Sequence, residues 1–107
     1  MATARISLPV KQSSITSSAT LQVHGKIVFL YASFNSATAL AAGSILYEVP
    51  EAYRPSSEVK LLGIIRQSTT GSQFMFNDVY VRSSGEVVQI ATNSNFGCTM
   101  FGVWEIA

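Results

Sequence analysis

Apolar and polar residues alternate along most of this chain, with a period of two rather than the period of an amphipathic helix. β-Branched and aromatic residues dominate the apolar positions, as is typical of strands. The pattern predicts an all-β fold of about eight antiparallel strands, at residues 4–10, 19–24, 26–34, 44–49, 58–66, 73–82, 86–91 and 97–106. No helix is indicated with comparable strength.

The connections between these segments carry turn-forming residues. The stretches STTGS at 68–72, SSGE at 83–86 and TNSNFG at 92–97 place glycine, asparagine or serine where positive φ angles or local side-chain hydrogen bonds are useful. Two of them are expected to be hairpin turns. A weak helical candidate is NSATALAAGS at 35–44, whose alanines would allow one turn, although Gly43 favours a loop at least equally.

Three of the predicted strands have no polar face, whereas an ordinary sandwich strand alternates apolar with polar. Residues 26–34 place Ile27, Phe29, Tyr31 and Ser33 opposite Val28, Leu30, Ala32 and Phe34. Residues 73–82 place Phe74, Phe76 and Tyr80 opposite Met75, Val79 and Val81. Residues 97–106 place Phe101 and Val103 opposite Cys98, Met100 and Trp104. Such strands need cover on both sides, and the simplest second cover is another copy of the chain.

Composition narrows the class of protein. The 107 residues suit a single domain, residues 1–107, in which residues 1–17 are also a candidate connecting segment. Charged residues make up 12% of the chain, about half of the roughly 25% found in ordinary soluble domains. The net charge is +1 and no Lys or Arg cluster occurs, which argues against a nucleic-acid partner.

Neither membrane insertion nor export by a signal peptide is expected. No apolar run approaches the length of a bilayer span, and the first residues lack the apolar core of a secretion signal.

Cys98 is the single cysteine, so the sequence predicts no intrachain disulfide and no thiolate metal cluster. It has no charged sequence neighbour to activate its thiol, so a buried, inert thiol is the default interpretation.

The sequence gives little support to an enzyme, and it indicates no cofactor and no metal. His24, Asp78 and a serine could be combined into a triad, but the G-x-S-x-G pattern of a nucleophile elbow is absent. A lone histidine next to Gly25 is more often a turn or edge residue than a catalytic base. We therefore expect a non-enzymatic protein.

The stretch EVPEAYRPSSEV at 48–59 puts two prolines and a Tyr-Arg pair between two predicted strands. Pro50 and Pro55 fix their own φ angles and push the preceding residues, Val49 and Arg54, toward extended geometry. Tyr53 can bury its ring while its hydroxyl bonds to nearby backbone. This arrangement predicts a rigid corner between sheets, and a structural role is favoured over a ligand site.

The same corner carries a resemblance. The stretch VPEAYRP follows AAGSILYE and precedes SSEVKLLG, a glycine-containing hairpin loop and an aromatic C-terminal strand. Residues 21–107 thereby resemble the head domains at the tips of phage tail fibres and baseplate receptor-binding proteins. The most specific match is Pro50, Tyr53, Arg54 and Pro55 at this spacing. The family pattern is closer to Leu-Pro-x-Gly-Tyr-Arg-Pro, so the chain departs from it at Val49 and Ala52.

The resemblance implies a jelly-roll β-sandwich, similar to the heads of tumour necrosis factor and complement C1q, that forms a homotrimer. It also implies a location on the virion tail, reached without a signal peptide, with other tail or baseplate proteins on the N-terminal side. Heads of this kind bind host cell-surface saccharides, often between protomers. A host cell-envelope saccharide is therefore the expected partner.

Saccharide binding needs an aromatic ring for stacking and planar polar groups for hydroxyls. The candidates by residue type are His24, Tyr31, Asn77, Asp78, Tyr80, Arg82, Asn93, Asn95 and Trp104. Each has a structural alternative. Trp104 is more often a core or interface residue in such a strand. Asn77 and Asp78 would suit an internal hydrogen-bond network, and the loop asparagines would suit left-handed backbone.

Three hypotheses follow from these observations. The leading one is a homotrimeric host-recognition head that binds a saccharide without chemistry. The second is a structural cap or trimerisation domain that binds nothing. The third is a monomeric carbohydrate-binding module of a hydrolase, which would not need strands that are apolar on both faces.

Overall fold

The computed structural model describes residues 3–12, 15, 17–35, 41–66, 74–90 and 97–107. Their fold is all-β, and the only helical element among them is a 3-10 turn at Glu51–Tyr53. The eight strands are β1 Thr3–Leu8, β2 Ala19–His24, β3 Ile27–Phe34, β4 Ile45–Glu48, β5 Val59–Arg66, β6 Phe74–Val81, β7 Glu86–Gln89 and β8 Gly97–Glu105. All eight predicted strands are confirmed, and their ends agree within two residues.

Every strand pairing is antiparallel, and the order in the sheet is β1-β2-β3-β8-β5-β6-β7-β4. The pairings are nested, because β5 pairs with β6, β4 with β7, and β3 with β8. This nesting is consistent with a jelly-roll-like sandwich. The two edge strands approach each other through a bridge between Val10 and Tyr47, and Lys11 N donates to Leu46 O at 2.9 Å, so the sheet is nearly closed.

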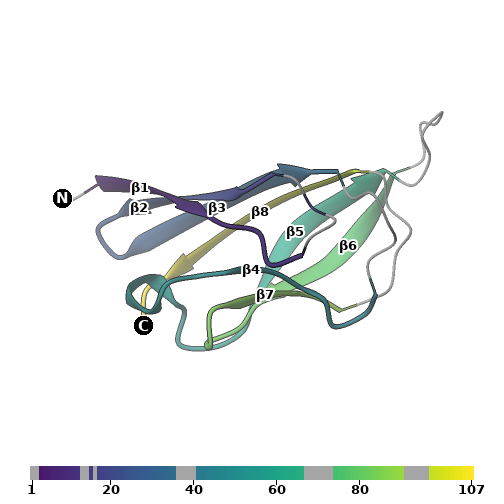
Figure 1. The fold of residues 1–107 in the computed structure, drawn as a ribbon. Coiled ribbons are helices and arrows are strands. Elements are labelled where there is room, and N and C mark those ends of the chain that lie inside the picture. Colours follow the sequence, from purple (N-terminus) through teal and green to yellow (C-terminus); the bar gives the residue numbers. More distant parts are fainter. Residues whose placement is uncertain (1–2, 13–14, 16, 36–40, 67–73, 91–96) are drawn as a thin grey trace.

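The sheet folds over on itself in two layers (Figure 1). β1, β2, β3 and β8 form the upper layer, and β4 and β7 lie below it. β5 and β6 lie between β8 and β7 in the sheet and cross from the upper layer to the lower one. The molecule is elongated, with extents of 44 × 22 × 22 Å. The first and last described residues lie at the same end of this long axis (Figure 1).

The core lies between the layers and is built from alternate residues of β2, β3 and β8 and from consecutive residues of β4 and β7. β2 and β3 show the alternation most clearly, since every second side chain in each is buried. Tyr47 of β4 is fully buried and its hydroxyl donates to the carbonyl oxygen of Ser17 at 2.8 Å. The pKa of the Tyr47 hydroxyl is raised well above its ordinary value, mainly by burial and to a smaller extent by the neighbouring Cys98. The inward residues of β2, β3 and β8 are Ala19, Leu21, Val23, Val28, Leu30, Ala32, Phe34, Cys98, Met100 and Trp104.

Residues 1–17, also predicted as a connecting segment, contribute to the domain where they are described. β1 pairs with β2 along its whole length, and Leu8 and Ile15 are buried in the core. A link from this segment to other proteins stays a prediction. In the weak helical candidate, residues 41–44 form a turn with Gly43 at a φ of 85°, while residues 36–40 lie outside the described part.

The corner, residues 49–55, joins β4 to β5. Pro50 leads into the 3-10 turn, and Tyr53 N donates to the Pro50 carbonyl at 2.9 Å. Arg54 is extended, with φ −76° and ψ 147°, as predicted for a residue that precedes proline. The prolines thus limit the backbone to the geometry that carries the chain from one layer to the other.

Arg54 folds back over the corner and closes it. Its Nε donates to the carbonyl oxygen of Val49 at 2.8 Å, and its guanidinium lies 4.0 Å from the carboxylate of Glu48. The space for this side chain comes from Gly85 in the β6–β7 turn, which has a φ of 93° and whose carbonyl accepts from Val49 N at 2.7 Å. A Cβ at Gly85 would collide with both the guanidinium and the Val49 carbonyl.

The corner also holds the end of the chain. The indole Nε1 of Trp104 donates to the Tyr53 carbonyl at 2.7 Å, and Ala107 N donates to the Arg54 carbonyl at 3.0 Å. The hydrogen bond predicted for the Tyr53 hydroxyl is not made within the described residues, and the ring packs, partly exposed, at the margin of the core. The backbone of Tyr53, not its hydroxyl, fixes this part of the fold.

Candidate functional site

The side of the sheet that faces away from the core, called the outer face below, can be read from the strand register. Residues paired across neighbouring strands point to the same side of a sheet. One cross-strand row contains Arg5, Gln22, Phe29 and Val103. The next row contains Ser7, Thr20, Tyr31, Phe101, Leu62 and Asp78. The outer face is therefore polar over β1 and β2 and apolar over β3, β8 and β5.

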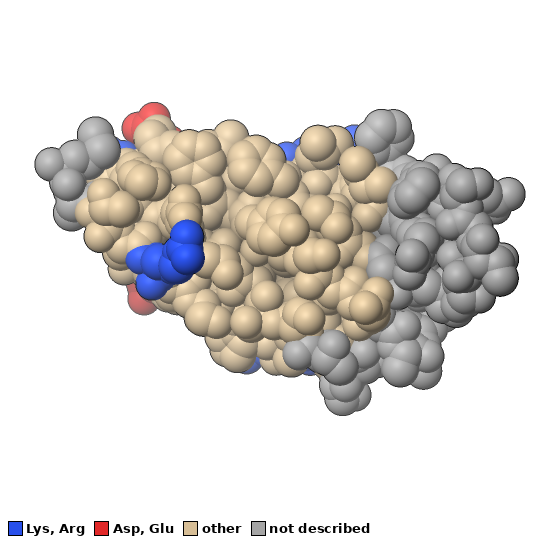
Figure 2. Space-filling model, turned by 90° about the horizontal axis from the view of Figure 1, so that it is seen from above, with Lys and Arg blue, Asp and Glu red and all other residues tan. Residues whose placement is uncertain are grey.

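Six exposed side chains over β3, β8 and β5 form what we call the apolar patch: Ile27, Tyr31, Leu62, Ile64, Phe101 and Val103. Their exposed fractions range from 38% to 56%. Figure 2 shows this side of the upper layer as a broad surface with few charged side chains. Of the three strands predicted to have two apolar faces, β3 and β8 thus bury one face in the core and leave the other at the surface. The burial of Phe74, Met75 and Phe76 in β6 lies outside the described part.

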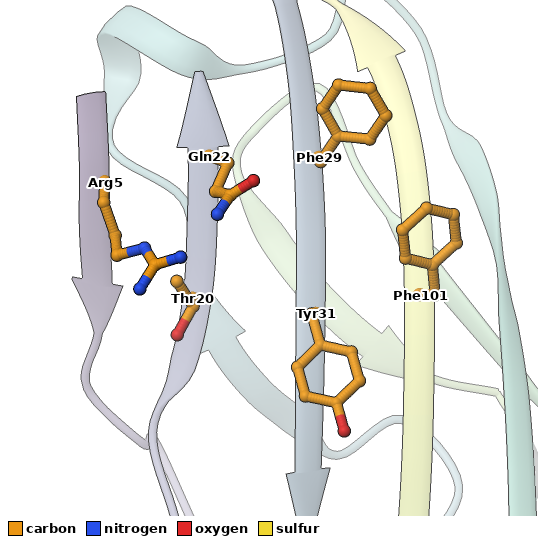
Figure 3. A pocket seen from close by; sticks show the side chains of 6 residues that line it. All are labelled: Arg5, Thr20, Gln22, Phe29, Tyr31 and Phe101. Atoms are coloured by element: carbon orange, nitrogen blue, oxygen red, sulfur yellow. The ribbon is translucent and has the colours of Figure 1, made fainter. Parts of the chain in front are cut away.

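A groove of about 390 Å³ lies where the apolar patch meets the polar strands, and it is lined by Arg5, Thr20, Gln22, Phe29, Tyr31 and Phe101. Figure 3 shows Arg5 reaching from β1 toward β2, with the three aromatic side chains on β3 and β8. The Phe29 and Phe101 rings lie 6.4 Å apart at 37° to each other. The groove therefore combines aromatic walls with one cation and two polar side chains.

Arg5 has no ion-pair partner among the described residues. The four ion pairs in that part of the chain join Lys11 and Arg54 to Glu48, Lys60 to Asp78, and Arg82 to Glu86. No hydrogen bond is made by the Thr20 or Gln22 side chains within the same residues. The polar groups of the groove are thus available to a ligand.

A second depression, of about 440 Å³, lies between the end of β1 and the start of β4 and is lined by Lys11, Gln12, Gly43, Ser44, Ile45 and Glu48. Lys11 and Glu48 face each other in it at 3.9 Å, so its opposite charges already compensate each other. It contains no aromatic side chain. The groove over β1, β2, β3 and β8 is the better candidate for a ligand with an apolar ring face.

The candidate site residues whose side chains the structure describes do not form one cluster. His24 lies on the outer face at the end of β2, and its ring centroid is 5.8 Å from that of Phe29 in a T-shaped arrangement. Asp78 is exposed on β6, 3.4 Å from Lys60, and Tyr80 is partly buried on the same strand. Arg82 lies at the β6–β7 turn, 3.8 Å from Glu86.

Among the remaining candidates, Tyr31 is the one that lines the groove. Trp104 is 5% exposed and lies in the core, the placement that the sequence favoured. The backbone of Asn77 pairs with Gly63 in β5, while Asn93 and Asn95 lie outside the described residues.

The described residues contain no group of three or more His, Cys, Asp or Glu side chains that could hold a metal ion. Cys98 is buried on the inner side of β8.

Within the described residues, no helix has the length and hydropathy needed to cross a membrane. No protein-family model and no curated protein matches the chain.

The sequence interpretation missed Arg5, Thr20, Gln22, Phe29 and Phe101 as groove residues. In the sequence alone, Phe29 and Phe101 indicate an oligomer face and carry no sign of the polar strand beside them. A usable signal was present in β2, where Thr20, Gln22 and His24 alternate with Ala19, Leu21 and Val23. That alternation places a polar strand on the outer face next to the aromatic one.

Proposed function

We propose that this protein is a non-enzymatic, homotrimeric recognition head of a phage or phage-like tail device, which binds a saccharide of the host cell envelope. The observation that carries the proposal is the apolar patch on the outer face of β3, β8 and β5. The jelly-roll-like fold and the proline corner support it, since both are expected of such heads.

A second copy of the chain is the occupant that best fits the part of the patch over β5 and the adjoining side of β8, around Leu62 and Ile64. Tyr31 and Phe101 would lie at the edge of this contact, where the groove stays open. The six side chains of the patch are 38% to 56% exposed and lie on three neighbouring strands, so they form one contiguous apolar surface. Contiguous exposed apolar surface of this kind, rimmed by polar residues, marks interaction sites. Charged groups stand at its margin, with Glu105 opposite Ile27 and the Lys60–Asp78 pair beside Leu62. An apolar centre with a polar rim is typical of an interface.

The threefold symmetry comes from the resemblance of the corner and its flanking segments to tail-tip heads. In such an assembly the end that carries both termini would face the fibre and the other tail proteins (Figure 1). The opposite end and the flanks would face the host. The protein would then act outside the cell as part of the virion tail, after synthesis in the host cytoplasm.

The test is the solution mass, measured by light scattering on a size-exclusion column at micromolar concentration. A trimer supports the proposal and justifies a search for glycans. A stable monomer contradicts it and favours a carbohydrate-binding module. A trimer that binds no envelope polysaccharide from plausible hosts would instead support a structural cap.

A further inference from the structure

We infer that the groove lined by Arg5, Thr20, Gln22, Phe29, Tyr31 and Phe101 binds a saccharide unit that carries a carboxylate, such as a uronate or a sialate. Arg5 binds the carboxylate, the aromatic rings receive the apolar face of the sugar, and Thr20 and Gln22 bind hydroxyls. This inference rests on the proposed function, because it names the class of saccharide that the head recognises.

The charge of the groove selects an anion. Arg5 is the one charged side chain that lines it, and no described acidic group pairs with this guanidinium. A guanidinium presents a planar set of donors that matches a carboxylate through two parallel hydrogen bonds. A neutral sugar would leave this cation without a partner.

The aromatic side chains select a ring over a small ion. Tyr31 is 53% exposed and Phe101 is 44% exposed in the single chain. Because both line the groove at the edge of the proposed contact between copies, their rings would remain open to a ligand. Phe29 is partly buried next to them. A pyranose has an apolar face that can lie against such rings, whereas inorganic phosphate would make no use of them.

The polar side chains complete the match. Gln22 lies directly opposite Arg5 and Phe29 in the register, and Thr20 lies opposite Tyr31. Figure 3 shows both side chains between the guanidinium and the aromatic residues. An amide and a hydroxyl each offer a donor and an acceptor, which suits the mixed hydrogen bonding of sugar hydroxyls. A single basic residue argues against a nucleic acid, whose phosphates need several.

The size of the groove fits a short saccharide. Its volume of about 390 Å³ lies within the range of small-molecule sites, roughly 300 to 1,000 Å³. The groove is shallow, so a single site would bind weakly. Three copies in a trimer would raise the apparent affinity for a repeating polysaccharide without new contacts.

The experiment uses an array of uronate- and sialate-containing oligosaccharides, each printed beside its methyl ester, which keeps the shape but removes the charge. The wild-type chain is expected to bind at least one acidic oligosaccharide and to bind the matching ester at least tenfold more weakly. Arg5→Gln is expected to abolish this preference. Lys11→Gln removes one exposed positive charge outside the groove and should leave the preference unchanged.

Two further measurements identify the source of the signal. Tyr31→Ala should weaken binding of the acidic sugar, while Tyr31→Phe, which keeps the ring, should retain it. Competition by millimolar inorganic phosphate that abolishes binding would mean a general anion site and overturn the inference. Circular dichroism of each variant verifies that the fold is intact.

The outcomes separate this inference from the proposed function. A trimer that binds neutral glycans, or in which Arg5→Gln does not change the preference for acidic glycans, refutes the acidic-sugar site. Neither result contradicts the proposed recognition head. A trimer silent on the whole array refutes the inference and favours the cap. A monomer that binds no glycan overturns both.

Discussion

Trp104 Nε1 donates a hydrogen bond to the Tyr53 carbonyl oxygen across 2.7 Å, and this bond joins the C-terminal strand to the proline corner. The two residues are 51 positions apart in the sequence. Trp104 is 5% exposed and its bond to Tyr53 is partly buried, so a side chain without the indole N–H would leave the carbonyl without this donor. The corner thus serves as the anchor for β8 as well as the link between layers.

Trp104→Phe should therefore lower the free energy of unfolding by about 1–3 kcal/mol, through an unsatisfied carbonyl and a smaller side chain. Urea unfolding followed by circular dichroism measures this. The matched control is Tyr53→Phe, which keeps the carbonyl and removes a hydroxyl with no partner among the described residues. Equal costs for the two variants would argue against the indole bond.

Gly85→Ala should destabilise the protein more than Gly43→Ala. Both glycines have positive φ, 93° and 85°, so both substitutions carry a similar backbone strain of about 1–2 kcal/mol. Only at Gly85 would the new Cβ meet the Arg54 guanidinium and the Val49 carbonyl, while nothing lies within 4 Å at Gly43. We expect an additional loss of about 1 kcal/mol or more from the broken Arg54 bond. Denaturant midpoints that coincide would show that Arg54 moves aside freely.

Ile64→Glu should convert the proposed trimer to smaller species, because it places a charge inside the apolar patch where the copies would meet. Ile90→Glu is a closely matched control, since both isoleucines are 41% exposed and Ile90 follows β7, outside the patch. Light scattering should give a reduced mass for the first variant and an unchanged mass for the second. If both keep the wild-type mass, the patch is not the interface.

Stability should fall at alkaline pH because of Tyr47. In the unfolded chain a tyrosine ionises near pH 10, whereas burial raises the pKa of Tyr47 in the fold and keeps its hydroxyl protonated. The raised pKa contributes stability that is fully present below about pH 10 and is lost progressively above it. Tyr47→Phe should cost about 1 kcal/mol at pH 7, because the bond to Ser17 is lost, and should flatten the decline above pH 10. Urea unfolding at pH 7 to 11 measures both effects, and parallel curves would contradict the assignment to Tyr47.

The strands could be predicted from the sequence because their signals are local. The alternation in β2 and β3 defines both faces of each strand, and Gly85 in SSGE marks the β6–β7 turn. The double-sided character of β3 and β8 was also visible, since Tyr31 and Phe101 stand on the side away from Leu30 and Met100. In each case one segment alone carries the information.

The candidate groove could not be predicted because it depends on register between distant strands. Arg5 meets Gln22 through the β1–β2 pairing, and Tyr31 meets Phe101 through the β3–β8 pairing. Residue type alone selected Asp78 and Trp104, but the first pairs with Lys60 and the second lies in the core. A pattern within one sequence segment does not predict which side chains become neighbours across a sheet.

The nested pairing of strands also has a kinetic consequence. β5 and β6 adjoin in sequence, whereas residues 35–96 separate β3 from β8. Closing the inner pair first shortens the effective loop for β4 with β7, and then for β3 with β8, so each step loses less chain entropy. We therefore expect folding to proceed outward from the β5–β6 hairpin, with a high φ-value for Val79→Ala in β6 and a low one for Leu30→Ala in β3. The reverse ranking would exclude this order. A chain emerging from the ribosome would carry an open β3 edge until β8, which follows the other seven strands in the sequence, is released.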